Sequence, residues 1–313
     1  MLIPNLIYFG ISALVLTISG IYLVKSLSKI ARFLGISEFS AAFIIMAFAS
    51  SIPELFVGIS SALNGNPALS LGNIIGANII NLTLISGIII ILSKEIKIES
   101  KKIGNDVYIM LVTILLIIAL FTIGKSLSRI DGVILLLVFG FHTYEVFKKR
   151  KKYPKKMENK LERKSRFKWL IIFLIALIGL FISSNYVVKY GSSLALDLNL
   201  PEIMLGLFIL SIATTLPELV FGISATKLKH KEMAIGDQIG SVVTNAALIL
   251  GIVAIIHPIS AEFRPFLISS IFMFISAFIF ATFLKTGNKL EKLEGISLIL
   301  IYILFIIIEF FVK

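Results

Sequence analysis

The chain has 313 residues, of which 58% are hydrophobic and only 15% are charged, and its mean hydropathy is +1.00. Soluble domains contain about 25% charged residues, so this composition predicts an integral membrane protein without a sizeable soluble domain. The chain has no cysteine, which excludes disulfides, thiolate metal sites and cysteine nucleophiles. Its formal net charge of +12 fits the basic loops of a membrane protein better than nucleic-acid binding.

Ten apolar segments have about the length that a bilayer requires, which is ~20 residues for a helix. The first has no basic residues before it and is too long for a signal-peptide core, so we interpret it as a spanning helix rather than a cleaved leader. The predicted spans cover residues 4–24, 38–63, 68–93, 104–124, 130–147, 169–188, 201–226, 232–257, 265–284 and 293–312.

The basic residues gather on one side of these spans. Of the 30 lysines and arginines, 25 lie in loops that follow the odd-numbered spans, and 5 lie on the other side. Because Lys and Arg favour cytoplasmic loops, we expect a multi-pass protein of the cell membrane with both termini outside and the basic loop 148–168 cytoplasmic. This loop is the only long linker. Its charge is best explained by topology, and binding of anionic membrane lipid is the alternative.

Two segments of the chain resemble each other. A shift of 164 residues aligns AFASSIPELFVGIS, from Ala47, with SIATTLPELVFGIS, from Ser211, and 16 of 45 pairs are identical between 47–91 and 211–255. The halves 1–147 and 169–313 then hold five spans each. Because five is odd, the second half must enter the membrane from the opposite side. The predicted fold is therefore all-α, with ten transmembrane helices in two inverted repeats and a binding site near the midplane.

The repeated motif places a carboxylate and a proline inside an apolar span. Ser50 and Ser51 lie on or near the helical face of Glu54, and Pro53 leaves the carbonyl of Ala49 without its helical partner. The second repeat supplies Thr214, Thr215, Glu218 and the carbonyl of Ala213 in the same way. All of these ligands are oxygens, which suit calcium and sodium. Two facing carboxylates repel, and one divalent cation, protons or two monovalent cations would neutralise them, which is a physical basis for exchange.

The spans that follow read GNIIGANIIN (72–81) and GDQIGSVVTN (236–245). We interpret Gly72, Gly76, Gly236 and Gly240 as positions of close helix packing. Asn81 and Asn245 are amides deep in apolar spans and need partners. Either they form hydrogen bonds between helices, or their amide oxygens bind an ion.

These motif pairs resemble the two alpha-repeats of the calcium/cation antiporter superfamily, and most of all those of prokaryotic sodium/calcium exchangers. The resemblance covers essentially the whole chain. It implies broken alpha-repeat helices, a first and a sixth span that slide as a pair against the other eight, and calcium and sodium as transported ions with no cofactor. It also implies a set of site residues. Calcium would be bound by Glu54 and Glu218 with Ser50 and Thr214, sodium by Ser51, Thr215, Ser241 and carbonyls near Ala47 and Ser211, and Asn81 and Asn245 would flank the centre.

The chain departs from that family at three positions. Ala77 stands where Ser is usual, Asn245 where Asp is usual, and Asp237 where Asn is usual. Exchange of calcium or another divalent cation for protons is therefore an alternative, although the chain lacks the GNxxE-like motif of the proton/calcium branch.

Two other classes fit less well. A cation channel could use a glutamate ring but needs no inverted repeat. An intramembrane protease would need a base near its serine or two facing aspartates. We expect no enzymatic activity and a protein that acts as a monomer.

Overall fold

A computed structural model of the chain describes residues 2–33, 47–97, 100–150, 163–228, 230–286 and 289–311. Most of these residues are helical, as the sequence predicts, and the structure also has two strands of three residues each. The elements are α1 (Leu2–Phe33), α3 (Ala47–Ser50), α4 (Ile52–Leu63), α5 (Pro67–Ile80), η2 (Asn81–Ile85), α6 (Ser86–Ser93), β1 (Glu95–Lys97), α7 (Ser100–Gly124), α8 (Arg129–Arg150), α9 (Arg163–Asp197), α10 (Glu202–Leu205), η3 (Gly206–Leu210), α11 (Ser211–Lys227), α12 (Lys231–Val243), η4 (Thr244–Ile249), α13 (Leu250–Ile256), α14 (Phe263–Thr286), β2 (Lys289–Glu291) and α15 (Lys292–Phe311). The η segments are π-helical turns that continue the neighbouring α-helices.

Seven helical stretches among the described residues are long and apolar enough to cross a membrane. They are Leu2–Leu27, Pro67–Ser93, Gly104–Gly124, Phe167–Asp197, Glu202–Lys227, Lys231–Ile256 and Phe263–Thr286. These stretches confirm a multi-pass membrane protein. The other three predicted spans also contain helix: α8 and α15 cover the fifth and tenth, and α3 with α4 covers the described part of the second. Residues 38–46 of the second span lie outside the described residues.

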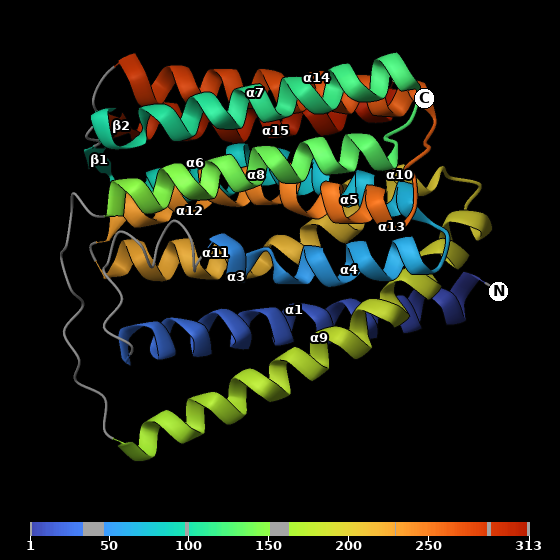
Figure 1. Cartoon of the computed structure of the whole chain (residues 1–313), viewed down its shortest axis with the longest axis horizontal. Coiled ribbons are helices and arrows are strands. Elements are labelled where there is room, and N and C mark those ends of the chain that lie inside the picture. Colours follow the sequence, from blue (N-terminus) through green and yellow to red (C-terminus); the bar gives the residue numbers. More distant parts are fainter. Residues whose placement is uncertain are drawn as a thin grey trace.

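The helices run roughly parallel and form a bundle with two distinct sides (Figure 1). Helices α1 and α9 pack against each other on one side, and α7, α14 and α15 lie on the other. Between them lie the helices that carry the repeated motifs, α4, α5, α11 and α12. The motifs are thereby placed at the centre of the bundle, away from the apolar outer surface that faces lipid.

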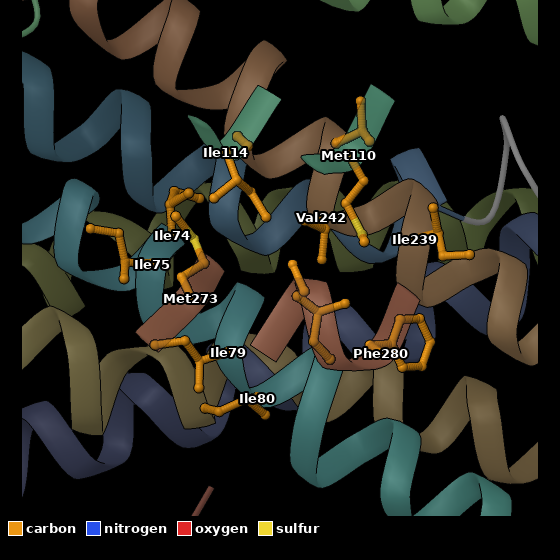
Figure 2. Packing of buried hydrophobic residues seen from close by; sticks show 14 of the residues in the cluster. Ile74, Ile75, Ile79, Ile80, Met110, Ile114, Ile239, Val242, Met273 and Phe280 are labelled. Atoms are coloured by element: carbon orange, nitrogen blue, oxygen red, sulfur yellow. The ribbon is translucent and has the colours of Figure 1, made fainter. Parts of the chain in front are cut away.

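Most of the apolar core lies between the central helices and the α7–α14 side. Figure 2 shows buried side chains of this cluster from α5, α7, α12 and α14, among them Ile75, Met110, Val242 and Phe280. A second apolar cluster lies along α1 and α9, with Leu16, Leu23 and Leu180 among its buried members. The α1–α9 pair thus packs against the rest of the bundle through a cluster of its own.

Several contacts between the two halves occur twice, with the partners exchanged. Strands β1 and β2 pair antiparallel, with Glu95 opposite Glu291, and an isolated bridge joins Leu127 to Ile259. Under the shift of 164 residues, Glu95 aligns with Ile259 and Leu127 aligns with Glu291, so the two pairings are equivalent. Helix α7 begins beside β1 and ends at the opposite end of the bundle, shortly before Leu127, so the two pairings lie at opposite ends (Figure 1).

Close contacts of glycines in the bundle also occur twice, with the partners exchanged between the two halves. A Cβ on Gly87 would lie 2.6 Å from the carbonyl oxygen of Gly295, and a Cβ on Gly132 would lie 2.7 Å from that of Gly251. Gly251 is the equivalent of Gly87 under the 164-residue shift, and Gly132 stands 163 residues before Gly295. Helix α6 therefore contacts α15 as α13 contacts α8.

The packing interpretation of Gly72 and Gly76 is confirmed. A Cβ on Gly72 would overlap the carbonyl oxygen of Ile203, and a Cβ on Gly76 would overlap that of Leu207 and lie 2.8 Å from the Cβ of Ser211. The backbone of α5 therefore touches the backbone of α10 and η3, as small residues allow between membrane helices. For Gly236 and Gly240 the interpretation remains a prediction.

We expect Gly72→Val to destabilise the protein by roughly 1–3 kcal/mol or more, because backbone atoms of Ile203 cannot move aside as a side chain would. The thermal midpoint of the purified protein in detergent measures this effect. Gly140→Val is the matched control, since nothing lies within 4 Å of a Cβ at that helical position. Equal midpoints for the two variants would contradict the close contact.

Candidate ion-binding site

The two prolines of the repeated motif affect their helices differently. In the first repeat the helix is interrupted at Ser51, between α3 and α4, with φ −79° and ψ 3°. In the second repeat α11 continues through Pro217, and the π-helical segment η3 precedes it. The break expected in both motif helices is therefore found in the first repeat only.

Helix α1 packs directly over both prolines. A Cβ on Gly20 would lie 2.7 Å from Cγ of Pro217 and 2.9 Å from Cγ of Pro53. One turn away, the hydroxyl of Thr17 donates a hydrogen bond of 2.8 Å to the carbonyl of Ala213. This is the carbonyl that Pro217 deprives of its helical partner. The expectation that it is left open is wrong, because a residue of α1 satisfies it.

Glu54 and Glu218 are fully buried, with 0% of each residue exposed. None of their four carboxylate oxygens has a hydrogen-bond partner, and neither forms an ion pair within the part of the chain that the structure describes. Glu54 lies near Thr214 of the second repeat, and Glu218 lies near Ser50 of the first, although neither pair forms a well-aligned hydrogen bond. Each carboxylate thus faces the hydroxyl of the opposite repeat. Buried charges without partners are costly, so a divalent cation, two monovalent cations or protons would stabilise this pair of carboxylates.

The hydroxyls of Ser50 and Thr214 each connect the motif helix of one repeat to the helix that follows the motif in the other repeat. The Oγ of Ser50 lies 3.1 Å from the Oγ of Ser241 and 3.5 Å from Oδ1 of Asp237, both on α12. The Oγ1 of Thr214 donates to Oδ1 of Asn73 on α5 at 3.1 Å. The 164-residue shift converts Ser50 to Thr214 and Asn73 to Asp237. Each repeat therefore binds its motif helix to the other repeat's following helix.

Asn81 and Asn245 each lie at or beside the start of a π-helical segment, η2 and η4, and both are fully buried. Nδ2 of Asn245 donates to Oδ1 of Asn78 at 3.1 Å, whereas its Oδ1 has no hydrogen-bond partner among the described residues. The same residues offer no partner to either amide atom of Asn81. The hydrogen-bonding role is therefore confirmed for the donor end of Asn245, and the two amide oxygens remain open. Such π-helical turns frequently mark functional sites.

The other residues predicted for the site lie on the same two motif helices. Ser51 is buried, and its hydroxyl has no hydrogen-bond partner in the described ranges. The hydroxyl of Thr215 lies 2.8 Å from the carbonyl oxygen of Ser211 and that of Thr214 lies 3.3 Å from it, so this carbonyl already accepts side-chain hydrogen bonds. The backbone of Ala47 begins α3.

Sequence reasoning did not single out Asn73, Asn78, Thr17 or Gly20. Asn73 and Asn78 carried a usable signal, because each is an amide in an apolar span, and Asn73 aligns with Asp237 under the repeat shift. Thr17 and Gly20 carried none, because small residues are common in membrane helices.

The chemistry of the centre is that of a hard cation site. Its open groups are carboxylate, amide and hydroxyl oxygens, which suit calcium and sodium. No group of three His, Asp or Glu residues within the described ranges lies close enough to hold one metal ion. An ion here would therefore be held by two carboxylates at most, together with neutral oxygens.

Comparisons with known proteins agree with this reading. Sodium/calcium exchanger MaX1 of Methanosarcina acetivorans is 27% identical over an alignment of 332 residues, and the alignment covers 93% of this chain and 94% of that protein. An uncharacterised membrane protein of Methanocaldococcus jannaschii is 26% identical over 304 residues, with 97% of both covered.

Solved structures of the sodium-calcium exchanger NCX_Mj match the fold. One soaked with 2.5 mM Na⁺ and 1 mM Sr²⁺ superposes with a TM-score of 0.68 at 25% identity, covering 98% of both chains. Another structure, soaked with 2.5 mM Na⁺ and 0.1 mM Ca²⁺, superposes with a TM-score of 0.67 at 26% identity, covering 98% of both chains. The family model described as "sodium/calcium exchanger protein" matches residues 4–148 and 168–311. The chain therefore belongs to the sodium/calcium exchanger family, as the two alpha-repeat motifs indicate.

Proposed function

We propose that this protein is a secondary active antiporter that exchanges calcium for sodium across the membrane. The observation that carries the proposal is the pair of glutamates at equivalent places in the two repeats. Both are fully buried, neither has a hydrogen-bond partner within the described part of the chain, and they come from opposite halves of a chain that belongs to an exchanger family. A divalent cation would neutralise both carboxylates, and so would two monovalent cations, so the two kinds of ion compete for one centre.

In this proposal calcium is held by Glu54 and Glu218 with Ser50 and Thr214. The contacts that support it are the approach of Glu54 to Thr214 and of Glu218 to Ser50. Sodium is held by Ser51, Thr215, Ser241 and the carbonyls of Ala47 and Ser211, and the oxygens of Asn81 and Asn245 flank the centre. The unpartnered hydroxyl of Ser51 and the open amide oxygens support these roles. The carbonyl of Ser211 would have to bind an ion while it accepts from Thr215.

We also propose ten spans in two inverted repeats, 1–147 and 169–313, joined by the cytoplasmic loop 148–168. Three kinds of contact that recur with exchanged partners support this architecture: the strand pairings, the glycine contacts and the hydroxyl contacts of Ser50 and Thr214. The pairings of β1 with β2 and of Leu127 with Ile259 lie at opposite ends of the bundle, as an inverted repeat requires.

The proposed orientation places both termini outside and loop 148–168 inside, beside anionic lipid headgroups. We expect a cysteine at Tyr153 to react with a membrane-impermeant thiol reagent only in inside-out vesicles, and a cysteine at Phe311 only in right-side-out vesicles. Because the chain has no native cysteine, each engineered thiol reports its own position. Reaction of both positions from the same side would contradict the five-plus-five inverted arrangement.

We propose that access alternates through a sliding movement of α1 and α9 as a pair. Their separate apolar cluster supports this, as does the position of Gly20 over both prolines. The hydrogen bond from Thr17 to Ala213 would then form in one position of α1 and break in the other. Movement of a rigid pair past a fixed centre is typical of transporters built from repeats.

Calcium uptake into proteoliposomes tests the function, with sodium and proton gradients imposed separately. Uptake that requires an outward sodium gradient at constant pH supports the proposal. Uptake that follows a pH gradient without sodium would favour the proton/calcium alternative. Calcium flux that needs no counter-ion on the other side would instead indicate a channel.

A further inference from the structure

The two halves of the ion site are built alike but differ in charge. Around Ser50 lie Asp237 and Ser241, a carboxylate and a hydroxyl. The equivalent positions around Thr214 are occupied by Asn73 and Ala77, an amide and a methyl group. One half of the centre therefore carries an extra negative charge and an extra hydroxyl that the other half lacks.

Asp237 has nothing that neutralises it within the described part of the chain. Its residue is 0% exposed, and it forms no ion pair there. Oδ1 lies 3.5 Å from the hydroxyl of Ser50, and Oδ2 accepts a hydrogen bond of 3.3 Å from Nε2 of Gln238. Neutral hydrogen bonds do not compensate a carboxylate charge in a low-dielectric interior. The position therefore favours a bound cation.

A second buried carboxylate lies near the same place. Glu218 is fully buried, its two oxygens have no hydrogen-bond partner among the described residues, and it lies near the Ser50 hydroxyl that also contacts Asp237. Ser50 thus stands between two carboxylates. Glu54, Glu218 and Asp237 do not close around one ion, because no three acidic or histidine groups among the described residues lie close enough for that. A calcium ion between the two glutamates would leave the charge of Asp237 uncompensated.

We propose that Asp237, with the hydroxyls of Ser50 and Ser241, forms a separate subsite for a monovalent cation, namely sodium, beside the Glu54–Glu218 pair. The inference rests on the proposed sodium/calcium exchange and names the residue that adds charge to it. One carboxylate and two hydroxyls form a hard oxygen set whose single negative charge matches a monovalent ion. In the sodium-loaded centre, this ion and two sodium ions at the glutamates together balance the three carboxylates, whereas calcium alone balances only two.

Displacement of calcium by sodium tests this subsite. The purified protein is loaded with radioactive calcium in detergent at fixed pH, and sodium replaces choline at constant ionic strength. We expect Asp237→Asn to raise the sodium concentration that displaces half of the calcium by at least about tenfold, and to lower the Hill coefficient of displacement by about one. The calcium dissociation constant without sodium should change less than about threefold. Asn is the natural residue at the equivalent position 73, so the substitution keeps the shape of the side chain.

Two further variants complete the test. Ser241→Ala should also raise the sodium concentration that displaces half of the calcium, but by a smaller factor, because it removes a neutral ligand of the same subsite. Glu309→Gln removes another buried carboxylate, on α15 outside the centre, and should leave sodium displacement unchanged.

The outcomes separate this inference from the proposed function. If sodium displaces calcium equally from wild type and Asp237→Asn, Asp237 is only a hydrogen-bonding residue and the inference is wrong. Asp237→Asn could instead weaken calcium binding as strongly as Glu54→Gln does and leave the displacement by sodium unchanged. Asp237 would then belong to the calcium site, and the inference would again be wrong. If sodium fails to displace calcium from wild type, sodium exchange itself is overturned and the subsite with it.

Discussion

Glu54→Gln and Glu218→Gln should each abolish calcium-coupled transport while the protein remains folded. Each substitution keeps the shape of a fully buried side chain and removes one of the two charges that face a divalent ion. A single carboxylate leaves one positive charge of calcium unbalanced in a low-dielectric site, and each lost pairing there costs several kcal/mol. That cost corresponds to at least a hundredfold loss of affinity. Calcium uptake into sodium-loaded proteoliposomes is the measurement.

Glu309→Gln is the matched control, because Glu309 is also a buried carboxylate, 4% exposed, but lies near the end of α15. It should transport calcium nearly as wild type does. An unchanged elution profile in size-exclusion chromatography would show that the two central variants fold. Near-normal uptake by either central variant would contradict a site built on two glutamates.

Calcium uptake should collapse when the sodium gradient is removed at constant pH, and Ala77→Ser should raise the apparent affinity for sodium. Ala77 is fully buried on α5, and its equivalent in the second repeat is Ser241, whose hydroxyl lies 3.1 Å from that of Ser50. A serine at position 77 would supply the missing hydroxyl on the side of Thr214. One added neutral oxygen ligand is worth about 1 kcal/mol, or roughly fivefold in affinity. The sodium concentration for half-maximal calcium uptake measures it.

Ala234→Ser controls for the cost of burying a hydroxyl, since Ala234 is equally buried but lies in the first turn of α12. It should leave the sodium dependence unchanged. Uptake that persists without sodium and follows an imposed pH gradient would show that protons drive the exchange. Glu54 and Glu218 would then carry the protons as well as bind calcium.

The sequence by itself determined the class of protein, the repeat and the residues at its centre. Apolar runs of about 20 residues predict membrane helices because hydrocarbon admits little else. A glutamate and a proline repeated 164 residues apart identify the centre, because a buried charge in a membrane is retained for a function. The resemblance of both motifs to the alpha-repeats indicated the family, and the match over residues 4–148 and 168–311 confirms it.

Only the tertiary structure decided how the repeats interlock. The contacts of Ser50 with Asp237 and Ser241, and of Thr214 with Asn73, join residues that are 187, 191 and 141 positions apart. The bond from Thr17 to the carbonyl of Ala213 spans 196 positions and closes a group that a local reading leaves open. Helical periodicity determines which face of a helix a residue occupies. It does not determine which distant helix crosses that face, because the crossing depends on how closely the glycine-bearing backbones approach.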